Sequence, residues 1–234
     1  MNKNKHLHAI VPHRGVNAGK SRLAAVLTDA GRARLNRWLL DRTLAVASAW
    51  LGDAARCVVV SPCEVTLALA RKAGATTLLE QSGAINLNAA LAQAAAHAAI
   101  QGAQRVLILP CDLPRLDVAA LRALDAVPVA DCDGDVVIAP DRHHQGTNAL
   151  LVNGHVREFA FGADSYARHM AQGSARGVRT VACVHPALAF DLDTADDFAE
   201  WCASDDAPHE FLAGLPRARN FPPAAVSAGP ASLA

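Results

Sequence analysis

The chain has 234 residues, and its 22 Lys and Arg residues balance 22 Asp and Glu residues, so the formal net charge at pH 7 is zero. This balance excludes the strongly basic surface of a nucleic-acid-binding domain, and no apolar run is long enough for a signal segment or a membrane span. Hydrophobic residues make up 52% of the chain, which suffices for one sizeable core. We expect a soluble, cytoplasmic protein with one α/β domain, no membrane contact and no nucleic-acid partner.

Short apolar runs alternate along the chain with segments of helical periodicity. The predicted strands cover residues 7–12, 57–61, 76–80, 105–110, 135–140, 148–152 and 178–184. The predicted helices cover residues 32–50, 65–73, 87–100, 118–124, 165–171 and 194–202. This alternation predicts βαβ units, hence a mostly parallel sheet with helices on both faces. Ligands of such sheets bind beyond the carboxyl ends of the strands.

Two features bear on the domain organisation. The six cysteines show neither a C-x-x-C pair nor the spacing of a metal site, so we expect reduced thiols in the core. Residues 206–234 lose the helical periodicity and are rich in Ala, Pro, Gly and Ser. We therefore expect a domain over residues 1–205 and a partly disordered or loosely docked tail over residues 206–234.

The segment "VPHRGVNAGKSRLAAVL" follows the first predicted strand and ends in Gly-Lys-Ser before a helix-like run. A Walker A loop needs four residues between its glycines, whereas Gly15 and Gly19 enclose three. A P-loop, a loop that embraces a triphosphate with the basic side chains of Arg14, Lys20 and Arg22, and a merely solvated basic loop are three open interpretations.

Acidic side chains follow two other apolar runs. "LILPCDLPRL" places Asp112 just beyond a strand, and "ALAFDLDTADDF" places Asp191 and Asp193 on the same side of an extended segment. If the two loops lie side by side, their carboxylates would suit Mg²⁺, which takes one or two carboxylates plus phosphate and water oxygens. The alternative for Asp112 is a cap on the following helix.

Two further loops offer groups for an anion. "APDRHHQGTNALLV" contains Gly146-Thr147-Asn148, and "FAFGADSYARH" contains Gly162 with Ser165 at the start of a short helix. Backbone N–H groups, hydroxyls and a helix N-terminus together could hold the phosphate of a small substrate. The alternative is that Asp164 only caps that helix.

Taken in order, "VPHRGVNAGKSRLAAVL", "INLNAAL", "LILPCDLPRL", "IAPDRHHQGTNALL", "FGADSYARH" and "FDLDTADDF" resemble the 2-phospho-L-lactate guanylyltransferases, the CofC/FbiD family of coenzyme F-420 biosynthesis. The resemblance runs from about Ile10 to Phe198. It implies one Rossmann-like nucleotidyltransferase domain that binds GTP and Mg²⁺.

The resemblance also implies roles for individual residues. Metal ligation and catalysis fall to the aspartates that match Asp112, Asp191 and Asp193, and Lys20 matches a catalytic lysine. Thr147, Gly162 and Ser165 match positions that hold the acceptor's phosphate, with Asn148 beside them. By eye, Ser82 and Asn88 match positions near the base or ribose. The implied substrate-binding residues are Arg14, Arg22, Ser82, Asn88, Thr147, Asn148, Gly162 and Ser165.

The reaction implied is transfer of GMP from GTP to the phosphate of a three-carbon acid, with release of pyrophosphate. The acceptors associated with the family are 2-phospho-L-lactate, phosphoenolpyruvate and 3-phospho-D-glycerate. A phosphate monoester is largely dianionic at neutral pH, so it can attack without a general base. A homodimer and hand-over of the product to the next enzyme of the pathway are further expectations.

The chain also departs from the family pattern. "VPHR" stands where V-P-V-K is usual, and Ala163 and Asp164 replace a proline and a glycine before Ser165. The rival interpretations are a nucleotidyltransferase of the molybdenum-cofactor type, a P-loop NTPase and a non-catalytic nucleotide-binding module. The first of these usually opens with a glycine pair that this chain lacks.

Overall fold

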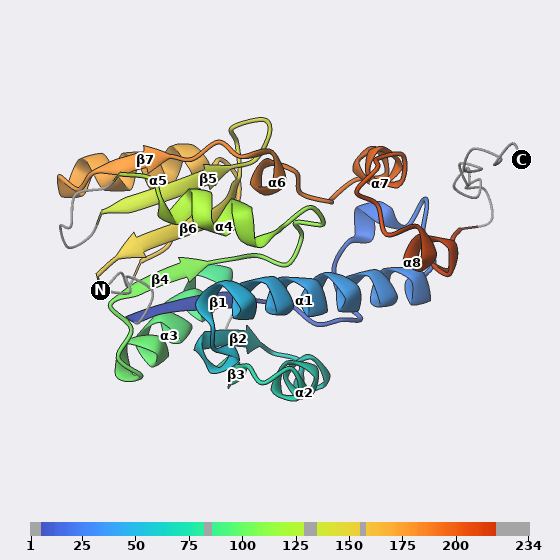
Figure 1. Cartoon of the computed structure of the whole chain (residues 1–234), viewed down its shortest axis with the longest axis horizontal. Coiled ribbons are helices and arrows are strands. Elements are labelled where there is room, and N and C mark those ends of the chain that lie inside the picture. The colour runs from blue at the N-terminus through green and yellow to red at the C-terminus, as the bar shows by residue number, and fades with distance from the viewer. Residues whose placement is uncertain (1–5, 82–85, 129–134, 155–157, 219–234) are drawn as a thin grey trace, which may run out of the picture.

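The computed structural model describes residues 6–81, 86–128, 135–154 and 158–218. The described strands form one sheet in the order β3-β2-β1-β4-β6-β5-β7 (Figure 1). Their bounds are β1 Leu7–Pro12, β2 Cys57–Ser61, β3 Thr76–Leu79, β4 Arg105–Ile108, β5 Val136–Pro140, β6 Thr147–Asn153 and β7 Thr180–Ala182. The neighbouring strands pair in parallel except at β6, which runs antiparallel to β4 and to β5. The predicted mostly parallel sheet is confirmed.

Helices cover both faces of this sheet. Their bounds are α1 Asp29–Leu51, α2 Glu64–Lys72, α3 Leu87–Ile100, α4 Val118–Asp125, α5 Ser165–Arg176, α6 Pro186–Ala189, α7 Ala195–Cys202 and α8 His209–Ala213, with 3-10 turns η2 Ser21–Leu23 and η3 Ala54–Arg56. Side chains of α1, α2, α4 and α6 share one apolar cluster with the sheet, and those of α3 and α5 share another. The chain is therefore a single α/β domain of the predicted kind.

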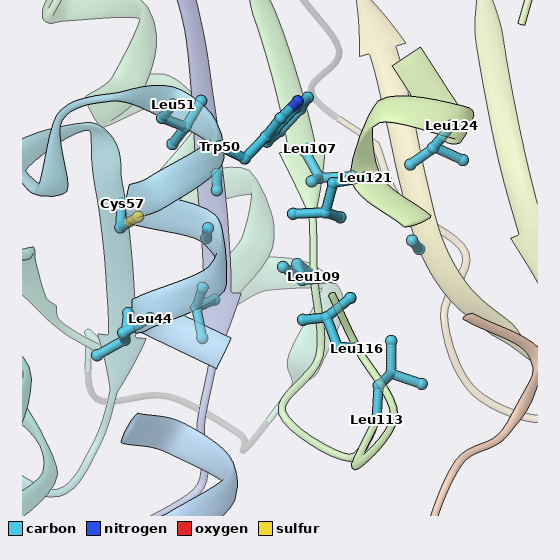
Figure 2. Packing of buried hydrophobic residues seen from close by; sticks show 14 of the residues in the cluster. Leu44, Trp50, Leu51, Cys57, Leu107, Leu109, Leu113, Leu116, Leu121 and Leu124 are labelled. Atoms are coloured by element: carbon cyan, nitrogen blue, oxygen red, sulfur yellow. The ribbon is translucent and has the colours of Figure 1, made fainter. Parts of the chain in front are cut away.

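The strands are buried on both faces, which explains their continuous apolar runs. In β1, Leu7, Ala9 and Val11 belong to the cluster under α1, and Ile10 belongs to the cluster under α3. Figure 2 shows the first cluster, in which Trp50 of α1 lies beside Leu107 of β4 and Leu121 of α4. This packing fixes the strand ends from which the functional loops extend.

A third apolar cluster lies beyond the sheet, where the first half of α1 packs against η2, α7 and α8 (Figure 1). It includes Leu39, Trp201, Leu212 and Leu215, all buried. A Cβ on Gly31 of α1 would lie 2.0 Å from the carbonyl oxygen of Pro216, so the C-terminal segment is held close. Residues 206–218 therefore belong to the packed domain, contrary to the expected boundary at residue 205. Residues 219–234 of the expected tail lie outside the described residues.

The element bounds differ from the predicted ones mainly at helix ends. Helix α1 begins earlier than expected because the Thr28 hydroxyl accepts from the Gly31 N–H as an N-cap. Helix α5 runs on to Arg176 because its stop is Gly177, a left-handed C-cap at φ 66°. The short helices α6 and α8 were not predicted, since one helical turn leaves little periodicity to read.

Candidate active site

A cleft of about 700 Å³ opens beyond the carboxyl ends of β1, β3, β4 and β5. Because β6 runs antiparallel, its first residues also lie at this edge of the sheet. The cleft brings together most of the predicted site residues, namely Arg14, Lys20, Arg22, Asp112, Thr147, Asn148, Gly162, Ser165, Asp191 and Asp193. Of the remaining two, Asn88 does not line the cleft and Ser82 lies outside the described residues.

The loop after β1 is held open by side chains from two helices. The Asn36 amide of α1 donates to the carbonyls of Val16, at 3.2 Å, and Ala18, at 2.9 Å. The Thr66 hydroxyl of α2 accepts from the Val16 N–H at 3.1 Å. Gly19 has a φ of 82°, a backbone conformation that favours glycine. The loop then leads into η2, which is one turn of 3-10 helix. A P-loop leads directly into an α-helix whose N–H groups surround the phosphate, so the P-loop interpretation is wrong.

Lys20 reaches from this loop to the acidic segment that follows α6. Its Nζ donates to the Leu192 carbonyl at 2.7 Å and lies 3.6 Å from Asp193 Oδ1. The Lys20 side chain is only 10% exposed, whereas that of Asp193 is 48% exposed. The acidic segment in turn joins the loop after β4, because the Leu192 N–H donates to the Asp112 carbonyl at 2.9 Å. The expected meeting of the two acidic loops is therefore observed.

The surroundings of Asp112 disfavour the ionised form of its carboxyl group. Its pKa is raised to about 6, mainly by burial; Lys20 lowers the pKa, whereas Asp193 and Asp191 raise it. Its Oδ1 atom is buried and has no hydrogen-bond partner within the described part of the chain. Asp117, not Asp112, caps α4 by accepting from the Ala120 N–H, so the capping interpretation of Asp112 is wrong. A cation at this position would stabilise the ionised form of Asp112.

Asp191 is placed by Asn148 of β6. The Asn148 amide donates to the Leu188 carbonyl at 2.9 Å and lies 3.3 Å from Asp191 Oδ1. Burial raises the pKa of Asp191, and the hydrogen bond from Asn148 lowers it. The Nδ2 of Asn148 therefore helps to position Asp191, and contact of Asn148 with substrate stays a prediction.

The three predicted metal ligands do not form a ready-made metal site. Among the residues that the structure describes, no three His, Cys, Asp or Glu side chains are arranged to hold an ion. The physical reason is charge: three converging carboxylates repel one another, and the Lys20 ammonium takes up Asp193 instead. Metal binding by Asp112, Asp191 and Asp193 together therefore stays a prediction.

The groups predicted to bind an anion also line the cleft. Thr147 and Ser165 are buried at 6% and 2% exposure, and both line the cleft. Gly162 has a φ of 119°, a conformation that disfavours any side chain. Asp164 makes no capping hydrogen bond to α5, so the capping interpretation of Asp164 is wrong.

Asn88 acts as a tie between elements. Its Nδ2 donates to the Phe161 carbonyl at 3.1 Å, and its Oδ1 accepts from the Phe161 N–H at 2.8 Å. Both polar ends of the amide are thus used, and the side chain fixes the loop that carries Gly162. The structure thus shows a positioning role for Asn88, and its expected contact with the base or ribose stays a prediction.

Three residues of the site were missed by sequence reasoning. Asn36 braces the first loop, His169 contacts Thr147, and Glu80 lines the cleft at the end of β3. A polar residue on the buried face of a helix is the signal that could have identified Asn36 and His169. Glu80 lies at the end of a predicted strand, but candidate acidic residues were sought only in the loops after other strands.

The fold is that of a nucleotidyltransferase. A solved nucleotidyl transferase from Methanothermobacter thermautotrophicus superposes with a TM-score of 0.57 and 16% identity, over 84% of this chain and 95% of that one. The chain belongs to the family of CofC-like guanylyl transferases, whose family model matches residues 7–217. The predicted family is therefore confirmed, and the chain is a nucleotidyltransferase enzyme.

Two relatives show the range of names within this family. A phosphoenolpyruvate guanylyltransferase from Rubrobacter xylanophilus is 40% identical over 197 residues, which cover 84% of this chain and 93% of the relative. A 3-phospho-D-glycerate guanylyltransferase from Phenylobacterium zucineum is 39% identical over 195 residues, which cover 82% and 88%. As for membranes, none of the described helices has the length and apolar character needed to cross one.

Proposed function

We propose that this protein transfers GMP from GTP to the phosphate of a three-carbon acid and releases pyrophosphate, as a step of coenzyme F-420 biosynthesis in the cytoplasm. The observation that carries the proposal is the partnerless Oδ1 of Asp112 next to the Lys20 ammonium, at the meeting point of three loops. A site with strong charges of both signs and room for two small anions suits nucleotidyl transfer.

The basic side chains of the first loop would bind the polyphosphate of GTP. Lys20 is held by Leu192 and Asp193, so its ammonium is positioned before substrate arrives. Arg14 and Arg22 line the same cleft and add positive charge. In the transition state these groups would stabilise the negative charge that develops on the leaving pyrophosphate.

A divalent cation, Mg²⁺ by our proposal, fits the carboxylates of Asp112 and Asp191. The buried Oδ1 of Asp112 lacks a partner in the described structure, and the pKa values of both carboxyl groups are raised, so both would gain from a cation. Mg²⁺ typically takes one or two carboxylates and fills its remaining positions with phosphate oxygens and water, so a site without three converging ligands is compatible with it. When bound, the ion would neutralise phosphate charge on the reacting groups. Asp193 would act mainly by holding Lys20, with metal ligation as its alternative role.

The acceptor would lie against Thr147, Gly162 and Ser165, which line the same cleft as Lys20. Its phosphate dianion would attack the α-phosphorus of GTP as pyrophosphate leaves. The protein's own contribution would be to align two anions and offset their repulsion, so no side chain needs to remove a proton.

The acceptor is phosphoenolpyruvate, 3-phospho-D-glycerate or 2-phospho-L-lactate. Relatives named for the first two acids are nearly equally similar to this chain, so overall identity does not favour either. Pyrophosphate release from GTP with each acid in turn, with ATP as the control nucleotide, tests the function. Release that requires one acid supports the proposal and identifies the acceptor. GTP binding without release under any acid would instead favour a non-catalytic nucleotide-binding module.

A homodimer and hand-over of the guanylylated product to the next enzyme remain predictions. A phosphoanhydride product is activated and open to hydrolysis, which is the chemical reason to expect direct transfer. Size-exclusion chromatography with light scattering tests the first expectation.

A further inference from the structure

His169 uses both ring nitrogens inside the protein. It lies on α5 at 5% exposure, and its Nε2 is 3.1 Å from the backbone nitrogen of Ala160. Its Nδ1 is 3.0 Å from the hydroxyl oxygen of Thr147 on β6. The ring of Phe161 meets the imidazole edge-on with centroids 4.9 Å apart, which fixes the ring plane. The imidazole is therefore held between two fixed partners.

These partners determine where the imidazole proton lies. The Ala160 N–H can only donate, so Nε2 must accept and carries no hydrogen. Burial lowers the pKa of His169 to about 4, so the ring is neutral and its single N–H is on Nδ1. The Nδ1–H must then donate to Thr147 Oγ1. Because Thr147 accepts from His169, its own hydroxyl hydrogen is free to point elsewhere.

We propose that His169 is a positioning residue that commits the Thr147 hydroxyl to donate its hydrogen to the acceptor's phosphate. This rests on the proposed function, because Thr147 lines the part of the cleft assigned to the acceptor. In the other tautomer the Thr147 hydroxyl would donate to His169. The lone pairs of its oxygen would then face the cleft and would repel an anion there. A threonine hydroxyl can either donate or accept a hydrogen bond. The imidazole restricts the Thr147 hydroxyl to donating toward the cleft, which selects an anion as its partner.

Two substitutions separate the halves of this arrangement. His169→Asn places an amide N–H near the position of Nδ1 and keeps a donor for Thr147. His169→Gln places an amide oxygen near the position of Nε2 and keeps the acceptor for Ala160. We expect His169→Gln to raise the KM and the calorimetric Kd of the acceptor acid by roughly 10- to 100-fold, the factor for one hydrogen bond to a charged group. His169→Asn should raise them by no more than about threefold, and the KM of GTP should stay within about twofold.

The same experiment includes readouts that a merely structural role would not move. In a Thr147→Val background, His169→Gln should add nothing to the acceptor Kd, because His169 acts through Thr147. Nitrogen-15 spectra of the free protein should show the Nδ1–H tautomer of His169. An Nε2–H tautomer, an unchanged acceptor Kd in folded His169→Gln, or an additive effect in the Thr147→Val background would each overturn the proposal. Acceptor binding without pyrophosphate release by the wild type would overturn the proposed function alone.

Glu80 is a second candidate, on separate observations. It follows β3, and its N–H donates to the Ser61 carbonyl of β2 at 3.0 Å, which extends the sheet by one residue. It lines the cleft together with the apolar side chains of Val60, Leu87 and Leu91. In the described structure its carboxylate has no hydrogen-bond or ion-pair partner. A carboxylate that can accept hydrogen bonds, next to apolar side chains, resembles the surroundings in which proteins bind the polar edge of a nucleobase.

The sheet places Glu80 at the far end of the cleft from the reacting groups. Strand β3 is three strands from β4, which leads to Asp112. At a strand spacing of about 4.8 Å, this separation is about 14 Å. An extended nucleotide that places its α-phosphate near Asp112 would bring its base toward Glu80. We also propose that Glu80 reads the guanine base by accepting from N1–H and the 2-amino group at once.

This contact would select guanine against adenine, because adenine presents a lone pair at N1 instead of a donor. Glu80→Gln should raise the KM of GTP at least about 10-fold and leave the acceptor KM within about twofold. The wild type should prefer GTP to ITP, which lacks the 2-amino group, and Glu80→Gln should lose that preference. Glu64→Gln, the same change on exposed α2, is the matched control. An unchanged ratio of GTP to ITP would overturn the role of Glu80, whereas equal use of ATP by the wild type would overturn guanylyl transfer itself.

Discussion

Asn88 and Phe161 are joined by two hydrogen bonds that use both ends of the asparagine amide. The pair ties α3 to the loop that precedes α5, although the two residues are far apart in the sequence. Since Gly162 follows Phe161 directly, the position of the proposed acceptor loop depends on this pair. Neither residue belongs to the loop of Lys20, which the proposed function assigns to the polyphosphate of GTP.

We therefore expect Asn88→Asp to weaken acceptor binding selectively. The new carboxylate would face the Phe161 carbonyl and could no longer donate to it. The acceptor KM should rise about 10-fold, while the KM of GTP should change less than about threefold. Steady-state kinetics with each substrate varied in turn measures the two effects. Equal increases in both KM values would contradict the assignment of this loop to the acceptor.

Asp112→Asn should separate activity from stability. Loss of the charge should reduce guanylyl transfer at least about 100-fold, since a neutral amide cannot offset a cation. The same variant should be more stable than the wild type at pH 8, by about 1–2 kcal/mol after screening through the cleft.

The pH dependence of this stability difference follows from the raised pKa. Burial raises the pKa of Asp112 to about 6 in the folded protein, above the ordinary value of 3.8. Between those values the folded state binds the additional proton, so wild-type stability falls as the pH rises through this window. Denaturation by urea at pH 4 and pH 8, without divalent cations, should show a small difference between the proteins at pH 4 and the full difference at pH 8. A wild type that is the more stable of the two at pH 8 would contradict the charge assignment.

Lys20→Met should slow the chemical step more than it weakens binding. The methionine side chain keeps most of the apolar stem but loses the ammonium that bonds Leu192. We expect kcat to fall at least about 100-fold, because the charge acts on the leaving pyrophosphate. Removal of Lys20 should also raise the pKa of Asp112 further, since Lys20 now lowers it. The pH profile of the residual activity measures this shift, which should move the acidic limb to higher pH.

Gly31→Ala should detach the C-terminal segment from α1. The new Cβ would meet the Pro216 carbonyl at 2.0 Å, so one of the two backbones must move. We expect a loss of at least about 2 kcal/mol of stability, measured by thermal or urea denaturation. Arg37→Ala, an exposed change on the same helix, is the control and should change stability by less than about 0.5 kcal/mol.

Sequence patterns predicted the core of the site because its acidic and basic residues follow apolar strands. Asp112 follows β4 and Arg14 follows β1, and such strands are readable as continuous apolar runs. The reversed direction of β6 was not predicted, because a run such as "NALLV" carries no information on strand direction. That reversal explains how Thr147, at the start of a strand, meets residues at the ends of others.

The sequence also could not predict which groups the polar side chains contact in the folded protein. Asn88 was assigned to the nucleotide by eye from the family resemblance, and the structure shows that its amide binds the backbone of Phe161. His169 and Asn36 have partners that only the folded chain brings near. Ser82 lies outside the described residues, so its expected contact with the base or ribose stays a prediction.

The antiparallel contact between β4 and β6 divides the molecule into two halves with different tasks. On one side, β3, β2, β1 and β4 pair in parallel and carry the loops assigned to the nucleotide. On the other side, β6, β5 and β7 carry the wall assigned to the acceptor. Substitutions in the second half could therefore change which phosphorylated acid is used. The first half, and with it the choice of nucleotide, could stay as it is.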